Sequence, residues 1–122
     1  MRIEITSFGH KYGEIAADIV LDMRCLGNPY WVPALRELSG LDAPVREYIL
    51  QDKDSATYLR TMLLLMEMQA KLAAQRGCEC LRIAVGCTGG RHRSVTAAVL
   101  LAQRLGEQGH TVHLTHRDIE RD

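Results

Sequence analysis

Four stretches of the chain have the hydrophobic pattern of β-strands. Residues 2–8 (RIEITSF) and 110–117 (HTVHLTHR) alternate apolar and polar positions, as expected for strands with one buried face. Residues 18–24 (DIVLDMR) predict a further strand, and residues 80–86 (CLRIAVG) are almost continuously apolar. A continuous apolar run predicts a strand in a sheet that is covered on both faces.

Three other stretches predict helices. Residues 42–51 begin with Asp42, a residue type that caps helix N-termini. Residues 54–77 are rich in Leu, Met and Ala and end at Gly77, which is typical of a helix C-terminus. Their apolar positions cover more than one face, so we expect this helix to pack against two surfaces. Residues 94–109 carry a single apolar stripe.

The order of these elements, strand–strand–helix–helix–strand–helix–strand, is typical of an α/β domain. The chain has 122 residues, enough for one hydrophobic core. Residues 25–33 (CLGNPYWVP) contain a glycine and two prolines and are expected to be irregular. The second half reads as a βαβ unit with parallel strands and a right-handed crossover. We therefore predict one domain, residues 1–122, with a small mixed or parallel sheet flanked by helices.

Composition and charge indicate an ordinary globular protein. Hydrophobic residues make up 47% and charged residues 25%, and the formal net charge is zero. No apolar run approaches the roughly 20 residues that span a membrane, and the first residues do not resemble a signal peptide. We expect a cytoplasmic protein without a membrane partner. The four cysteines, Cys25, Cys78, Cys80 and Cys87, lack zinc-site spacing, so we expect reduced thiols, no metal and no cofactor.

The stretch VGCTGGRHRSV, at positions 85–95, lies between a predicted strand and a predicted helix. A helix N-terminus offers free N–H groups and a partial positive charge. Gly89 and Gly90 allow the backbone to curl around an anion, and Arg91 and Arg93 offer fork-shaped donors. These features predict an anion-binding loop, with phosphate as the best ligand. The alternative is a plain tight turn whose arginines face solvent.

The same loop suggests a second chemistry. Cys87 and Arg93 form a C-x5-R pattern followed by Ser94, which resembles the signature loop of cysteine phosphatases. There a thiolate at a helix N-terminus attacks phosphorus. In this chain Gly86 stands where those enzymes usually carry histidine, and no aspartate can be assigned as general acid. A phosphatase that uses Cys87 and Arg93 therefore remains the alternative to a cysteine that is simply buried at a strand end.

A wider resemblance covers nearly the whole chain. The segments SFGHKYG, LDMRCLGNPYWVPALRELSGLDAPVREYI, IAVGCTGGRHRSV and THRDIE resemble, in this order, the C-terminal domain of the RapZ (YvcJ) family of RNase adapters. The patterns GCTGG-x-HRSV and NP-x-x-VP-x-LR carry the resemblance. It implies an oligomeric α/β regulatory domain that follows a P-loop nucleotide-binding domain. It also implies binding of glucosamine-6-phosphate and of small RNAs that are presented to a ribonuclease.

The loop analysis and the resemblance together give a set of candidate residues. For the ligand they are Thr88, Gly89, Gly90, Arg91, His92, Arg93, Ser94, Asp22, Arg24, Asn28, Lys11 and Tyr12. Lys11 and Tyr12 fit a second wall of the pocket or a solvated turn. Asp22 and Arg24 fit ligand contacts or a structural ion pair. Tyr30 and Trp31 fit a stacking platform, although core or interface positions are the commoner role for such aromatics.

The chain departs from the family pattern in two respects. It has no G-x-x-x-x-G-K-[ST] motif, so nucleotide binding would fall to a separate P-loop protein as a partner. The RNA-binding candidates are Arg91 and Arg117, but the acidic residues Asp118, Glu120 and Asp122 follow them and should repel phosphates. We therefore predict a non-enzymatic, homo-oligomeric adapter that binds a sugar phosphate or another phosphate or sulfate anion. A small RNA or a ribonuclease is the further partner.

Overall fold

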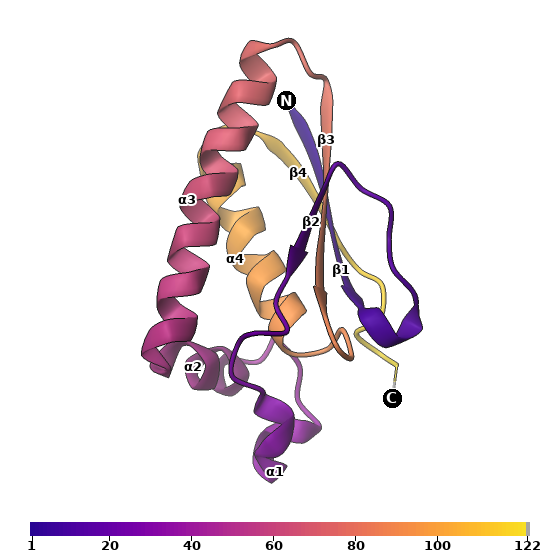
Figure 1. The fold of residues 1–122 in the computed structure, drawn as a ribbon, viewed down its shortest axis with the longest axis vertical. Coiled ribbons are helices and arrows are strands. Elements are labelled where there is room, and N and C mark those ends of the chain that lie inside the picture. The colour runs from indigo at the N-terminus through magenta and orange to yellow at the C-terminus, as the bar shows by residue number, and fades with distance from the viewer. Residues whose placement is uncertain (122) are drawn as a thin grey trace.

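The four predicted strands form a single parallel sheet in the computed structural model, which describes residues 1–121 (Figure 1). The strands are β1 (Arg2–Gly9), β2 (Ile19–Asp22), β3 (Cys80–Cys87) and β4 (Thr111–His116), in the spatial order β2-β3-β1-β4. β1 and β3 form the central pair, and every pairing is parallel. The carboxyl ends of all four strands therefore meet at one edge of the sheet.

The three predicted helices are confirmed, with small shifts at their ends. They are α2 (Ala43–Gln51), α3 (Lys53–Gln75) and α4 (Arg93–Glu107). Three short elements, which the sequence pattern did not predict, are η1 (His10–Tyr12), η2 (Pro29–Trp31) and α1 (Pro33–Arg36). The last two lie within and just after the stretch that glycine and proline were expected to keep irregular. No helix within residues 1–121 has an apolar stretch long enough to cross a membrane.

Local hydrogen bonds explain where the helices begin. Asp52 caps α3, because its Oδ2 accepts hydrogen bonds from the Ser55 N–H (3.0 Å) and hydroxyl (2.7 Å). Asp42 is the N-cap residue of α2, as predicted, but its side chain does not bond to the helix. The Asp42 carboxylate accepts from the Ser39 N–H (2.8 Å), in the preceding turn, and makes no capping bond to its own helix. Gly77, after the end of α3, has a φ of +85°, as expected for a glycine that ends a helix.

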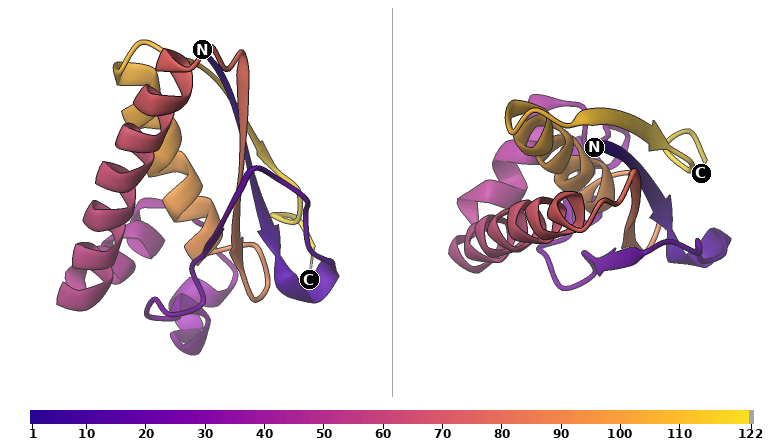
Figure 2. Two further views of the ribbon diagram at one scale, coloured as in Figure 1. Left: turned by 45° about the horizontal axis from the view of Figure 1, so that its top comes forward. Right: turned by 90° about the horizontal axis from the view of Figure 1, so that it is seen from above.

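The helices pack on one face of the sheet, as both views of Figure 2 show. Ile3, Ile5, Ile83 and Val85 point to this side and are fully or almost fully buried in the core with side chains of α3 and α4. On the second face, the expected cover comes from a coil and not from a helix. The opposite face is polar at its middle and is crossed by residues 13–18, the coil that returns the chain from β1 to β2. On this face β3 presents the exposed Arg82 and the small residue Ala84 next to the coil.

The longest helix, α3, packs against α2 and α4 through one side only. Leu59, Met62 and Met66 are buried there. The second apolar side, which includes Leu64 and Met68, is more than half exposed in this single chain. This helix was expected to be covered on two sides, but within residues 1–121 it is covered on one.

Candidate functional site

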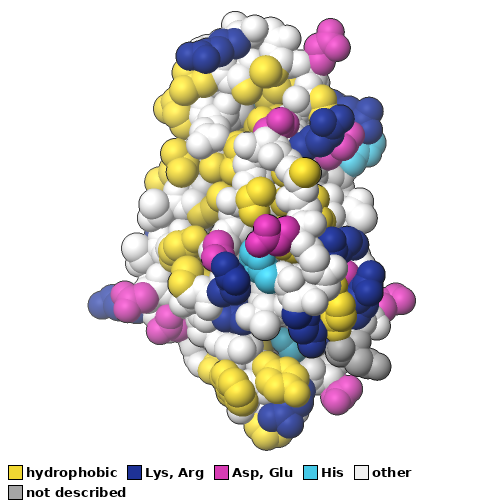
Figure 3. Space-filling model, turned by 45° about the vertical axis from the view of Figure 1, so that its right-hand side comes forward, with side chains coloured by type: hydrophobic (Ala, Val, Ile, Leu, Met, Phe, Trp, Pro, Cys, Tyr) yellow, Lys and Arg dark blue, Asp and Glu magenta, His cyan; other side chains and the backbone are white. Residues whose placement is uncertain are grey.

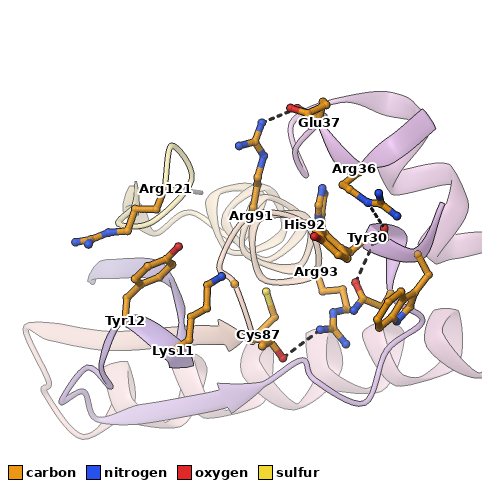
Figure 4. Close-up of a pocket in the computed structure, with 14 residues that line it drawn as sticks. Lys11, Tyr12, Tyr30, Arg36, Glu37, Cys87, Arg91, His92, Arg93 and Arg121 are labelled. Carbon is orange, nitrogen blue, oxygen red and sulfur yellow. Dashed lines mark hydrogen bonds between the residues drawn. The ribbon is translucent and has the colours of Figure 1, made fainter. Parts of the chain in front are cut away.

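A cavity of about 520 Å³ opens at the carboxyl edge of the sheet (Figure 4). This is the edge where open parallel α/β sheets bind ligands, and the volume suits a small molecule. The walls come from the loop between β3 and α4, from η1, from η2 and α1, and from the C-terminal segment. The lining residues are Lys11, Tyr12, Asn28, Tyr30, Trp31, Arg36, Glu37, Cys87, Thr88, Gly89, Arg91, His92, Arg93 and Arg121.

The glycine loop forms the floor of the cavity. Gly90 has a φ of +77°, and a Cβ atom there would lie 2.5 Å from the Gly9 nitrogen. The loop can therefore press against the end of β1 only with glycine at this position. η1 is tied to the same loop, since the Lys11 N–H donates to the Thr88 carbonyl (3.2 Å). Gly90 supports the floor from behind, whereas Thr88 and Gly89 line the cavity.

Cys87 ends β3 with its thiol inside the loop. The Gly90 N–H donates to Sγ (3.3 Å), and the thiol donates to Ser94 Oγ (3.2 Å). Ser94 is fully buried in the first turn of α4, behind the thiol, and does not line the cavity. A Cβ atom at Gly86 would lie 2.6 Å from both His10 Nε2 and the Phe8 ring. The histidine that usually precedes a phosphatase cysteine therefore has no room in this fold.

Arg93 is the most unusual charge of the site. It is only 6% exposed. Its Nη1 donates to the carbonyls of Arg24 (2.8 Å) and Leu26 (3.2 Å), and its Nη2 donates to Thr88 Oγ1 (3.4 Å). No carboxylate within residues 1–121 forms an ion pair with it. A buried charge without a counter-ion is costly, so this guanidinium favours an anion in the adjoining cavity.

Arg91 is held from the other side of the cavity. Its guanidinium donates to the carbonyls of Glu37 and Leu38, which follow α1. Its own carbonyl accepts from the Gly40 N–H (2.9 Å). These bonds join the glycine loop to the segment between α1 and α2 and position Arg91 in the lining.

The lining is strongly cationic although the whole chain is neutral. Five lining side chains are Lys or Arg, and Glu37 is the one carboxylate among the lining residues of the described chain. In Figure 3, Lys and Arg side chains gather on the lower half of the molecule, where the strands end. The distribution of charge therefore creates an anion-attracting site that net charge conceals.

His92 is a lining residue that is only 7% exposed. Burial lowers its pKa, and the neighbouring Arg91 lowers it further, against a hydrogen bond with the Leu38 carbonyl. The imidazole is therefore neutral at pH 7. Its Nε2 has no hydrogen-bond partner within residues 1–121. A buried polar atom without a partner beside a cavity suits a ligand hydroxyl or amine.

Tyr30 and Trp31 form an aromatic wall. Trp31 is 73% exposed, and the two rings meet edge to face at 5.8 Å. The Arg36 guanidinium lies 4.8 Å from the centre of the Tyr30 ring. The Asn28 side chain accepts from the Tyr30 N–H (3.1 Å) and so shapes this wall. A core role for these aromatics is therefore wrong, and a stacking platform and an interface between chains are the two roles that agree with their exposure.

Asp22 and Arg24 lie outside the cavity lining. They form an ion pair with each other, with Arg24 Nη2 2.8 Å from Asp22 Oδ2. The hydrogen bond from Arg24 lowers the pKa of Asp22 to about 2. The structural alternative thus describes their side chains better than ligand contact. The Arg24 carbonyl still serves the site, because it holds Arg93.

The C-terminal segment exposes Glu120, as expected, but withdraws Asp118 from the surface. Asp118 is fully buried and accepts from Arg117 Nη2 and Arg121 Nε, each at 2.8 Å. Its carboxylate therefore does not face an approaching RNA, contrary to the sequence-based expectation. Arg117 is occupied as well, since its Nη2 also donates to the Gly13 carbonyl (2.7 Å). Asp122 lies outside the described residues.

Three lining residues were missed by the sequence interpretation: Arg36, Glu37 and Arg121. Arg36 belongs to the NP-x-x-VP-x-LR pattern, so that motif could have indicated it. Arg121 had no signal in the sequence, because its place in the lining depends on its ion pair with buried Asp118 and on its contact with the Tyr12 ring.

Comparison with known proteins identifies the family. The model of the RapZ C-terminal domain family matches residues 1–120. The chain belongs to the RapZ C-terminal domain family. Among its relatives are proteins of Pelobacter propionicus (48% identical over 99% of this chain) and Lactiplantibacillus plantarum (46% over 98%), both named nucleotide-binding proteins. The chain covers 42% and 40% of these two relatives, so it corresponds to about two-fifths of their length.

Proposed function

We propose that this RapZ C-terminal domain is a regulatory adapter that binds a phosphorylated small molecule, with the phosphate in the glycine loop. The observation that carries the proposal is Arg93, a buried cation without a carboxylate partner among residues 1–121, beside the N–H groups in the first turn of α4. A phosphate dianion would satisfy both the charge and the donors. The surplus of cations in the lining supports the same ligand class.

We further propose an amino-sugar phosphate of the glucosamine-6-phosphate type. Glu37 lies in the lining, and its carboxylate would pair with the ammonium group. His92 Nε2 would accept a hydrogen bond from a sugar hydroxyl, and the Tyr30 and Trp31 wall would face the sugar ring. One ligand would thus contact the carboxylate of Glu37, the cationic side chains and the His92 Nε2 atom of the same cavity.

Isothermal titration calorimetry with three ligands tests this proposal. Glucosamine-6-phosphate should bind more tightly than glucose-6-phosphate, and unphosphorylated glucosamine should bind least. Glu37→Gln should abolish the difference between the two phosphates and leave the affinity for glucose-6-phosphate unchanged. Equal binding of glucosamine and its phosphate, or no binding of either, would overturn the phosphate site.

The adapter role involves macromolecular partners in the cytoplasm. We propose a homo-oligomer whose partner is a small RNA or a ribonuclease, with nucleotide binding supplied by a P-loop protein. Arg91 and Arg117 are the RNA candidates, yet both guanidiniums are partly occupied by internal hydrogen bonds. The metabolite site is therefore better supported than the RNA surface.

The C-x5-R phosphatase stays the competing proposal, because Cys87 lines the cavity and its sulfur accepts the Gly90 N–H. The crowded site at Gly86 argues against it, and among residues 1–121 Glu37 is the one lining carboxylate that could act as general acid. We predict no turnover of an aryl phosphate by the wild-type protein. Hydrolysis that disappears in Cys87→Ser would establish the phosphatase instead.

A further inference from the structure

The C-terminal segment, residues 117–121, forms one wall of the cavity through Arg121. In Figure 4, Arg121 and Lys11 lie on the same side of the cavity, next to Tyr12. The Arg121 guanidinium is 4.8 Å and the Lys11 ammonium 5.1 Å from the centre of the Tyr12 ring. Two cations thus share one aromatic ring at the rim of an anion-attracting cavity.

Buried Asp118 holds this wall in place. Its carboxylate accepts from the Gly9 N–H (2.8 Å) as well as from Arg117 and Arg121. Burial alone would raise the pKa of Asp118, but hydrogen bonds from Arg117 and the Gly9 N–H lower it below its usual range. The ionised carboxylate therefore fixes the position of the Arg121 side chain through their ion pair.

The same carboxylate is linked to the phosphate loop. Gly9, whose N–H it binds, packs backbone to backbone on the loop, since a Cβ atom at Gly9 would lie 2.5 Å from the Gly89 carbonyl carbon. The next residues of η1 are bonded to Thr88. Asp118 thus joins the C-terminal wall, the end of β1 and the glycine loop in one buried contact.

The charges of the wall are not balanced within the described chain. Asp118 carries one negative charge and is shared by Arg117 and Arg121. Lys11 has no carboxylate within ion-pair distance among residues 1–121. An anionic ligand group near this wall would offset part of its excess positive charge, which is more costly at a low-dielectric rim than in water.

We propose that Arg121 is a ligand-binding residue, that Asp118 is the positioning residue for it, and that ligand binding is coupled to the docking of residues 117–121. The inference rests on the proposed phosphate site. Arg121 contacts the anionic group of the ligand from the wall opposite Arg36. Occupancy of the cavity stabilises the docked C-terminal segment, and a partner that pulls this segment away weakens ligand binding by the same factor.

Calorimetry with glucosamine-6-phosphate as the probe tests the binding residue. Arg121→Gln should weaken binding about tenfold, which corresponds to about 1.4 kcal/mol, and Arg121→Lys should retain part of the affinity. Arg82→Gln is the matched control, because Arg82 is an exposed arginine on the polar face of the sheet, and it should bind like the wild type. Wild-type affinity in Arg121→Gln would overturn the inference. Absence of binding by the wild-type protein would instead defeat the proposed function.

Amide hydrogen exchange tests the coupling. The Arg117 N–H donates to the Ser7 carbonyl (3.0 Å) and the Gly9 N–H donates to Asp118 Oδ2 (2.8 Å), so the exchange of these two amides reports docking of the segment. The probe should slow this exchange in the wild type, and Asp118→Asn should lose both the protection and the affinity. Unchanged exchange in the wild type with bound ligand would overturn the coupling, even where Asp118→Asn fails to fold. Wild-type affinity in a folded Asp118→Asn protein would overturn the positioning role.

Discussion

At the scale of single residues, the site depends on positions where the backbone admits one residue type and on charges that lack counter-ions. Gly90 combines a positive φ with contact to the backbone of Gly9. Arg93 combines burial with hydrogen bonds to two carbonyls and the Thr88 hydroxyl, none of which carries a negative charge. Both are close to the start of α4, so backbone geometry and charge act on the same ligand group.

Gly90→Ala should destabilise the fold and weaken ligand binding. The left-handed backbone costs an L-residue about 1–2 kcal/mol, and the clash with Gly9 adds to it. Gly89→Ala is the matched control, because a Cβ atom there meets nothing within 4 Å and its φ is not positive. Urea unfolding of both variants measures the difference. Equal stability of the two would contradict this account of the loop.

The buried imidazole of His92 predicts a pH dependence. Burial lowers its pKa from the ordinary value of 6.5, so the unfolded chain binds the proton more readily. The stability that the neutral ring contributes is present above about pH 6.5 and is lost as the pH falls. Burial also lowers the pKa of His116. Chemical unfolding between pH 7.5 and 5 should show declining stability, with a smaller decline in His92→Gln. An identical decline in that variant would contradict the assignment.

The presence of candidate ligand-binding residues in the glycine loop was predictable from the sequence, but the roles of the individual residues were only partly predictable. The pattern of glycines and arginines indicated an anion site, because both features are local. It did not indicate that Ser94 lies behind the thiol or that the Asp22 and Arg24 side chains pair with each other. Such roles depend on which side chain turns inward, and that is decided by contacts between segments distant in sequence.

At the scale of elements, the site is built where four parallel strands end. Arg93, at the first position of α4, donates to the carbonyls of Arg24 and Leu26 and so ties the helix to the segment after β2. Strand and helix periodicity predicted the regular elements well. It missed η1, η2 and α1, which are too short to show a period.

Arg93→Ala should weaken the binding of glucosamine-6-phosphate by a charge-assisted contact of roughly 1.5–3 kcal/mol. It should also loosen the segment after β2, because two carbonyl acceptors lose their donor. Arg104→Ala, near the other end of α4, is the control, since this arginine pairs with Glu67 of α3 away from the cavity. Calorimetry and thermal unfolding measure the two effects. Ligand affinity unchanged in Arg93→Ala would contradict its role.

At the scale of the whole molecule, a neutral chain places its positive charge around one cavity. The chain has 15 basic and 15 acidic residues, so attraction of a polyanion must be local. Net charge and the acidic tail, read from the sequence, did not reveal this, because the burial of Asp118 removes one acid from the surface. Charge placement follows from the fold and not from composition.

RNA binding should therefore be weak and moderately salt-dependent. With about three phosphate contacts, the slope of log affinity against log salt concentration should be about −2 to −3. Fluorescence anisotropy with a structured small RNA and a scrambled control, across a salt series, measures it. Nanomolar binding at physiological salt, or a much steeper slope, would mean a larger basic surface assembled from several copies.

The most direct measurement is a crystal structure of the protein with glucosamine-6-phosphate. The account predicts the phosphate within hydrogen-bond distance of the loop N–H groups between Thr88 and Arg93 and of the Arg93 guanidinium, with the sugar in the cavity toward Glu37. A phosphate bound outside this cavity, or a ligand whose phosphate points away from the glycine loop, would contradict it.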